Sequence, residues 1–210
     1  MGITERKERE KQQRREEIIR AAEDVFFTKG IDLATMDDVA ERAELSKGTL
    51  YLYFRNKEDL YVAVAQSAID LLRRSMDGIE DGPDPALDKL QAMGRQTVRF
   101  ARSHPNHMKA ILLLEGFEVK QSGVTIHDVK EAILRDSPVG LLIRILEQGI
   151  SEGLIRRDIP ATLLAHTLWM QTISVIRFVY GRADILESLE LKTDQVFEIH
   201  LELLLHGIRA

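Results

Sequence analysis

The sequence predicts an all-α protein of two parts, a small N-terminal domain of three helices and a larger C-terminal helical bundle. Glycine (13) and proline (5) are scarce among the 210 residues and fall mostly where helices are expected to end. Apolar residues recur at the three- and four-residue spacing of amphipathic helices. No segment alternates with a period of two over a length that predicts a strand.

Composition excludes several classes of protein. Hydrophobic residues make up 44% and charged residues 30% of the chain, which is typical of a soluble globular protein. The absence of cysteine excludes disulfides, thiolate zinc sites and thiol nucleophiles, and it suits a reducing cytoplasm, where we expect the protein to lie. Residues 1–15 lack the apolar core of a signal peptide. The apolar stretches are interrupted before the roughly 18 residues that a membrane span needs.

Three N-cap signatures within about twenty residues define the N-terminal domain. They follow an amphipathic helix expected over residues 11–29, which ends at Gly30. Thr35 caps a helix expected over residues 36–43, and Ser46 caps one over 47–54. Asn56 caps a long helix over residues 57–78. The close spacing of the two short helices is that of a helix-turn-helix. The apolar stripe of the first helix consists of Ile18, Ile19, Ala22, Val25 and Phe26.

The C-terminal domain begins after a loop of acidic, glycine and proline residues that follows Ile79. We therefore divide the chain into an arm with the helix-turn-helix (1–56), a connecting helix (57–79) and a C-terminal domain (80–210). The C-terminal helices are expected over residues 87–103, 108–117, 125–135, 138–152, 161–180 and 192–208.

The third helix has the features that a DNA recognition helix requires. Leu50 and Phe54 are four residues apart and can pack on the preceding helix, which leaves the polar residues of the segment facing outward. Gly48 costs a helix roughly 1 kcal/mol relative to alanine, and close approach to DNA is a reason to keep it. Lys57 and Thr35 are placed to hold phosphates on either side.

Charge distribution agrees with local DNA contact although the net charge is −5. Residues 45–57 contain three bases and no acid, whereas residues 61–210 contain 17 bases and 20 acids. A small basic surface on an acidic body is an electrostatic footprint for nucleic acid.

The ordered series Ala34-Thr35-Met36-Asp37-Asp38-Val39-Ala40, Leu45 to Phe54 and Asn56-Lys57-Glu58-Asp59-Leu60 resembles the DNA-binding signature of the TetR (tetracycline-repressor) family. The resemblance covers about residues 14–62. It implies a ligand-responsive transcriptional regulator, a homodimeric repressor that a small-molecule effector releases from double-stranded operator DNA. It also implies that Lys47, Gly48, Thr49 and Tyr51 approach bases or adjacent phosphates. Thr35, Ser46, Tyr53 and Lys57 are implied to hold phosphates.

The last two long helices are apolar around most of their circumference, which predicts burial on two sides. One side is expected on the core of the same chain and the other on a twin subunit. Adaptable or aromatic residues expected on interior faces are the candidates for effector contacts, with His166 as a polar contact. A mostly apolar pocket predicts a hydrophobic or aromatic effector. The candidates are Met93, Phe100, Met108, Leu112, Phe117, His166, Trp169, Met170 and Phe178.

Two other classes of function and one feature stay open at this point. An all-α enzyme is disfavoured because Glu-x-x-His, glycine-rich phosphate loops and other catalytic motifs are absent, so we expect no enzyme, no cofactor and no metal site. A helical adaptor that no longer binds DNA is disfavoured because Lys47, Tyr51 and Lys57 are present. The basic arm either enters a minor groove or is a frayed extension of the first helix.

Overall fold

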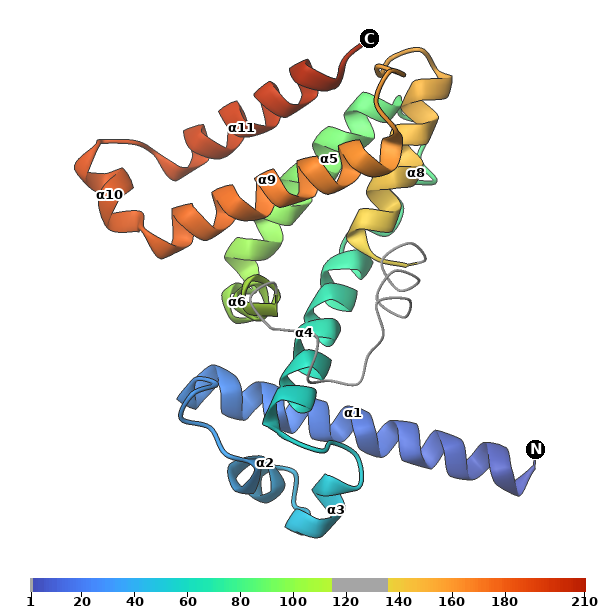
Figure 1. Ribbon diagram of the computed structural model, residues 1–210, viewed down its shortest axis with the longest axis vertical. Helices are drawn as coiled ribbons and strands as arrows, with labels where there is room; N and C mark the ends of the chain where they lie inside the picture. Colours follow the sequence, from blue (N-terminus) through green and yellow to red (C-terminus); the bar gives the residue numbers. More distant parts are fainter. Residues whose placement is uncertain (1, 115–135) are drawn as a thin grey trace. The chain divides into compact units, whose positions relative to one another are not determined.

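A computed structural model describes residues 2–114 and 136–210, and every regular element in these ranges is a helix (Figure 1). The prediction of an all-α fold is confirmed. The predicted helix over residues 125–135 and the candidate Phe117 lie outside the described residues. The helices are α1 (Ile3–Lys29), α2 (Met36–Arg42), α3 (Lys47–Tyr51), α4 (Lys57–Arg74), α5 (Ala86–Ser103), α6 (Pro105–Leu114), α8 (Pro138–Ser151), α9 (Ala161–Gly181), α10 (Ala183–Ser188) and α11 (Thr193–Ile208).

Several helix boundaries differ from the predictions. α1 begins at Ile3 instead of residue 11, because polar side chains four residues apart stabilise it, as in the Arg6–Glu10 ion pair of 3.0 Å. α3 ends at Tyr51 because the next two amides bond to carbonyls three residues back, in a tighter turn. α6 begins at Pro105, since proline is tolerated in a first helical turn. α10 was not predicted.

The described residues form two compact units. Residues 2–68 and 109–114 belong to the first unit, and residues 69–108 and 136–210 belong to the second. α4 runs through both units, with residues 57–68 in the first and 69–74 in the second.

The first unit has a core of α1, α2, α3 and the first turns of α4. Ile18, Leu50 and Leu60 are completely buried, so the apolar stripe of α1 lies in the core of this unit, as the inner face of an amphipathic helix should. The ring of Phe26 lies 5.8 Å from that of Tyr61, whose hydroxyl donates to the Ala110 carbonyl oxygen at 3.3 Å. Burial raises the pKa of the Tyr61 phenol to about 12. These contacts fix the start of α4 within this unit.

The second unit is a bundle of α5, α8, α9 and α11. Its core contains Phe100, Leu141, Ile145 and Ile173, all fully or almost fully buried. At Gly94 of α5 an added side chain would collide with Leu201 of α11, so glycine permits the close approach of these two helices. No helix in the described ranges combines the length and apolar character that crossing a membrane requires.

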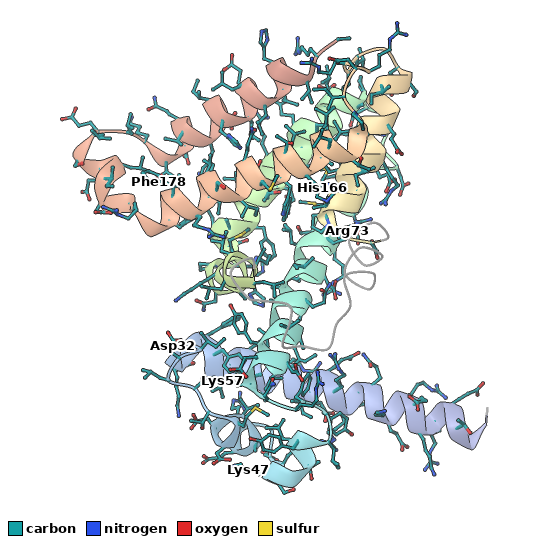
Figure 2. All side chains as sticks on the ribbon, in the orientation of Figure 1. Asp32, Lys47, Lys57, Arg73, His166 and Phe178 are labelled. Carbon is teal, nitrogen blue, oxygen red and sulfur yellow. The ribbon has the colours of Figure 1, made fainter. Side chains whose placement is uncertain are left out.

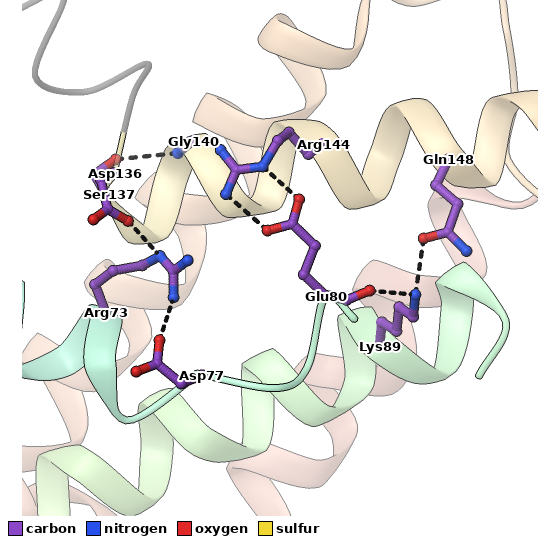
Figure 3. Close-up of polar contacts among 9 residues, drawn as sticks. All are labelled: Arg73, Asp77, Glu80, Lys89, Asp136, Ser137, Gly140, Arg144 and Gln148. Carbon is purple, nitrogen blue, oxygen red and sulfur yellow. Dashed lines mark hydrogen bonds and ion pairs between the residues drawn. The ribbon is translucent and has the colours of Figure 1, made fainter. Parts of the chain in front are cut away.

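A polar cluster holds the end of α4 and the following connection inside the second unit (Figure 3). Arg73 forms ion pairs with Asp77 (3.0 Å) and Asp136 (3.1 Å). Glu80 receives two hydrogen bonds from Arg144 of α8, at 2.5 and 2.9 Å, and this pairing lowers the pKa of Glu80. The buried ammonium of Lys89 donates to the Glu80 carbonyl at 2.7 Å. Arg73 and Lys89 are mostly buried, so pulling the cluster apart would leave these two charges without partners in a poorly solvated position.

Candidate DNA-binding surface

The start of α2 is fixed by a reciprocal cap between Thr35 and Asp38. The Thr35 hydroxyl accepts from the Asp38 amide at 3.2 Å, and the Thr35 amide donates to the Asp38 carboxylate at 2.9 Å. Lys29 also pairs with this carboxylate at 2.7 Å. The Lys29 hydrogen bond and then those of Thr35 lower the pKa of Asp38 to about 2. The predicted phosphate ligand Thr35 is therefore held as a helix cap, with its backbone anchored at the surface.

The turn between α2 and α3 is closed by a left-handed residue that is not glycine. Glu44 has φ 55°, and its amide bonds to the Glu41 carbonyl at 3.1 Å. The Leu45 amide bonds to the Ala40 carbonyl at 2.9 Å. These two bonds are those of a Schellman motif, in which glycine is the usual left-handed residue. The turn sets the angle at which α3 leaves α2.

The first turn of α3 is capped and cross-linked to α2. The Ser46 hydroxyl accepts from the Thr49 amide at 3.1 Å, and the two hydroxyl oxygens lie 2.8 Å apart. The Lys47 ammonium pairs with Asp37 in the first turn of α2 at 2.7 Å. The hydrogen bond with Asp37, with its charge, raises the pKa of Lys47. The N-terminal turns of α2 and α3, which both carry free amide groups, are thus joined at one exposed surface.

The side chains of α3 and of the turn that follows it point inward and outward as the sequence predicts. Leu50 and Phe54 are buried, as are Val39 and Ala40 of α2, which confirms the predicted packing face. Ser46, Lys47 and Gly48 are exposed, and Thr49 is half-buried. Tyr51 is 43% exposed. The outward face of α3 is therefore polar and accessible (Figure 2).

Gly48 stands in open space within this surface. Among the described residues, a methyl group built at Gly48 would meet Ser46 Oγ alone within 4 Å, at 3.9 Å, and its φ is not in the left-handed region. Nothing described within the protein therefore requires glycine at this position.

Lys57 has a different environment from the one expected for a free phosphate ligand. Its ammonium donates to the backbone carbonyls of Ile31 (2.7 Å), Ala34 (3.1 Å) and Asp32 (3.3 Å), in the connection between α1 and α2. All three of its donors are used in ordering this loop (Figure 2). Beside it, Asn56 caps α4 by accepting from the Asp59 amide at 2.7 Å.

Three residues of this surface were missed by the sequence analysis. The sequence gives Asp37 no role beyond its place in the family's series, because its pairing with Lys47, ten residues away, leaves no local signal. Glu44 lacks the glycine that usually marks a left-handed turn. Leu52 is 82% exposed beside Tyr51, because the turn that ends α3 points it outward.

Comparison with known proteins agrees with this geometry. Residues 18–64 match the family model described as bacterial regulatory proteins, tetR family. The chain is 25% identical over 198 residues to the fatty acid metabolism regulator protein of Bacillus subtilis, covering 91% of this chain and 94% of that protein. It is 24% identical to the HTH-type transcriptional repressor KstR2 of Mycolicibacterium smegmatis, covering 93% of this chain and 90% of the repressor.

Residues 18–64 carry the DNA-binding domain of the TetR family, and these similarities support a TetR-family transcriptional regulator. The chain is a DNA-binding regulator, and its relatives are transcription regulators rather than enzymes. The fold resembles that of the Bacillus subtilis regulator FadR solved in complex with stearoyl-CoA, with a TM-score of 0.66, 22% identity and coverage of 91% of this chain and 98% of that one.

The second unit contains a small apolar cavity between α5, α8, α9 and α11. Met93 and Trp169, two of the predicted effector contacts, line it. Its volume is about 50 Å³, well below the roughly 300 Å³ or more of a small-molecule site. Two buried hydroxyls contribute polarity, and that of Thr172 lies 3.1 Å from the His200 ring. Burial lowers the pKa of His200, which favours the neutral ring. The lining residues are Leu90, Met93, Gly94, Thr97, Leu142, Leu168, Trp169, Thr172, Leu201, Leu204, Leu205 and Ile208.

The other effector candidates are dispersed. Phe100 and Met108 are buried in the second unit, and Leu112 is half-buried in the first. His166, Met170 and Phe178 are exposed on α9, although Met170 and Phe178 were expected on an interior face and His166 as a polar contact in the pocket. Within the described ranges, no group of three or more His, Asp or Glu residues is arranged to hold a metal ion.

Proposed function

We propose that this regulator acts as a homodimeric repressor, which inserts α3 of each subunit into operator DNA and is released by a small molecule with a long apolar chain. The observation that carries the DNA-binding part is the exposed polar face of α3, held on a buried apolar face by Leu50 and Phe54. A rigid scaffold below and accessible polar groups above are what recognition in the major groove requires.

Within the α3 surface, Lys47, Gly48, Thr49 and Tyr51 are proposed to contact bases or nearby phosphates. Lys47 must leave Asp37 to do so. The side chains of Lys47 and Asp37 are 58% and 64% exposed, so solvent screens the pair and a phosphate can replace the carboxylate at small cost. Thr35, Ser46 and Tyr53 are proposed to hold phosphates beside the helix ends, where free amide groups favour anions.

Dimerisation is proposed to use α9 and α11, because both expose large apolar side chains in stripes. On α9 the exposed residues follow one another by seven and eight positions, and on α11 by four, so each set shares a face of its helix. Such a patch is typical of a protein–protein interface. The members are Leu163, Met170, Phe178, Ile199 and Leu203, with exposed fractions between 47% and 67%. Two-fold pairing of this face supplies two heads for two half-sites.

The effector is proposed to carry a long apolar chain, as in a fatty acyl thioester. The support is the almost wholly apolar lining of the cavity and the names of two similar proteins, a fatty acid metabolism regulator and a regulator crystallised with stearoyl-CoA. A cavity of about 50 Å³ does not admit such a chain as it stands. Binding therefore requires the surrounding helices to separate, which couples ligand binding to a change in the bundle.

Transmission is proposed to run along α4. Tyr61 ties α4 to the first unit, and the ion pairs of Arg73 tie it to the second. A change in the bundle that shifts Arg73 would then move the helix and alter the separation of the two heads. The effector acts only to the extent that it binds one separation more tightly than the other.

The test uses the full-length protein and fluorescence anisotropy on duplex DNA obtained by selection from random sequences. We expect specific binding over scrambled duplex, and release on addition of long-chain acyl-CoA but not of free CoA. Failure to select any duplex contradicts the DNA-binding part. Acyl-CoA that binds without changing DNA affinity contradicts the effector part.

A further inference from the structure

The first turns of α1 extend past the other helices of the first unit and carry a dense set of charges (Figure 1). All side chains described from Thr4 to Arg14 are exposed. Since the segment is helical, the position of each charge around the helix axis follows from its spacing. Lys7, Lys11 and Arg14 are four and three residues apart, so they form one stripe.

This basic stripe continues the buried face of α1. Lys11 lies seven residues before Ile18, and Lys7 lies eleven residues before it; both spacings are close to whole numbers of turns. Ile18 is completely buried against the core of the helix-turn-helix. The stripe is therefore on the side of α1 that faces α2 and α3 further along.

Arg15 marks where the stripe meets the recognition segment. Its guanidinium lies 5.0 Å from the centre of the Phe54 ring, just after α3. At a rise of 1.5 Å per residue, Lys11 and Lys7 lie roughly 6 and 12 Å further along the axis. Duplex DNA carries one phosphate charge per roughly 1.7 Å of its length, so this interval spans several phosphates.

The acidic residues of the segment do not neutralise the stripe. Glu10 pairs with Arg6 at 3.0 Å, on another side of the helix. Among the ion pairs of the described residues none involves Lys7 or Lys11, and neither has a further polar contact there. Arg14 pairs with Glu17 at 2.7 Å, in an exposed pair that a phosphate can replace.

We propose that the stripe of Lys7, Lys11 and Arg14 is a second DNA-binding surface, which contacts backbone phosphates flanking the half-site occupied by α3. This inference rests on the proposed DNA-binding function. A folded helix presents these side chains to phosphates without entering the minor groove, and such contacts add affinity without adding base specificity. With three contacts from each of two subunits, the stripe contributes about 5 to the slope of log affinity against log salt concentration.

The test compares two full-length variants with equal loss of charge. The stripe variant carries Lys7→Gln, Lys11→Gln and Arg14→Gln. The control carries Arg6→Gln, Arg9→Gln and Arg20→Gln, three bases that share the opposite side of the same helix. Glutamine keeps the helical propensity of the bases that it replaces. Arg15 stays unchanged because it packs on Phe54.

Anisotropy is measured on the selected operator and on scrambled duplex between 50 and 200 mM salt. We expect the stripe variant to have a slope less steep by about 3 to 5, and the control to differ from wild type by less than about 1. Over a fourfold change in salt, a slope difference of about 5 corresponds to a roughly thousandfold difference in lost affinity. Operator and scrambled DNA should be affected alike, so the ratio of the two affinities stays within about threefold.

Equal slopes for the stripe variant and the control, with wild-type protein still binding the operator, would overturn this inference and leave the proposed function intact. Wild-type protein that binds no duplex would overturn both. Circular dichroism and sedimentation of both variants confirm that fold and dimer are retained, so that a changed slope reports on DNA contact.

Discussion

Replacing Gly48 by alanine should make the protein more stable and a weaker DNA binder. An alanine in a helix is favoured over glycine by up to about 1 kcal/mol, because the glycine backbone loses more freedom on folding. The added methyl group meets Ser46 Oγ at 3.9 Å, which is ordinary van der Waals contact, and no strain in φ arises. The first turn of α3 should therefore gain about 0.5–1 kcal/mol.

The same substitution of Gly48 should weaken DNA binding. If α3 approaches the duplex as closely as glycine allows, the methyl group must displace the helix or a phosphate. We expect operator affinity to fall at least tenfold, which corresponds to about 1.4 kcal/mol. The melting temperature should rise by roughly 1–4 °C, given the size of the chain.

The assay pairs thermal unfolding with anisotropy on the operator, using Gly181→Ala as the control. Gly181 ends α9, and a methyl group there meets no described atom within 4 Å. Both variants should gain stability, and only Gly48→Ala should lose DNA affinity. Unchanged operator affinity in Gly48→Ala would refute close approach at this residue, and a loss of stability would refute the packing argument.

Four further predictions follow from other contacts. Lys57→Ala should lower the free energy of unfolding by about 1–3 kcal/mol, because it leaves carbonyls of the α1–α2 connection without a donor. Denaturant unfolding measures this loss, and an unchanged free energy would contradict the role of Lys57 in ordering the connection. Glu44→Gly should raise the melting temperature by removing a left-handed strain of about 1–2 kcal/mol, less the entropy cost of glycine; a lower melting temperature would contradict the turn geometry. Leu203→Glu puts a charge on the proposed dimer surface, so sedimentation should show monomers while circular dichroism shows that each subunit keeps its helices. A dimer that persists would place the interface elsewhere. Because the pKa of Asp38 is lower in the folded state, its contribution to stability is present above pH 3.8 and is lost as the pH falls toward 2. The difference in stability between wild type and Asp38→Asn should therefore shrink over that window in an acid titration.

The starts of the N-terminal helices were predictable because their signals are local. Thr35 and Ser46 each cap the helix that begins at the next residue, and a side-chain oxygen bonding to an amide three residues on needs no tertiary contact. Helix ends were less predictable. α3 stops at Tyr51 because the chain tightens to bury Phe54, which only the packed core decides. The left-handed Glu44 was missed for the same reason, since its conformation follows from how α2 and α3 pack.

The faces of the C-terminal helices were not predictable from periodicity alone. α9 is apolar around most of its circumference, so its pattern does not distinguish the side on the bundle from the side left exposed. Ile173 and Ile176 are buried there, while Met170 and Phe178 are exposed. Their assignment as effector contacts therefore stays a prediction. Their exposure makes them stronger candidates for the dimer surface than for the cavity.

The two lysines that the family resemblance implies as DNA contacts differ in how their charge is held, and this difference predicts different roles. Lys47 rests on a single exposed carboxylate, that of Asp37, and a phosphate offers the same charge and oxygen donors in its place. Lys57 rests on backbone carbonyls of the loop that presents Thr35, and removing it from them would free that loop. A phosphate can therefore replace Asp37 as the partner of Lys47. It can contact Lys57 only while Lys57 keeps its bonds to the loop carbonyls. If so, Lys47→Ala should affect DNA binding alone, whereas Lys57→Ala should affect stability and DNA binding together, and equal patterns in the two variants would contradict this division.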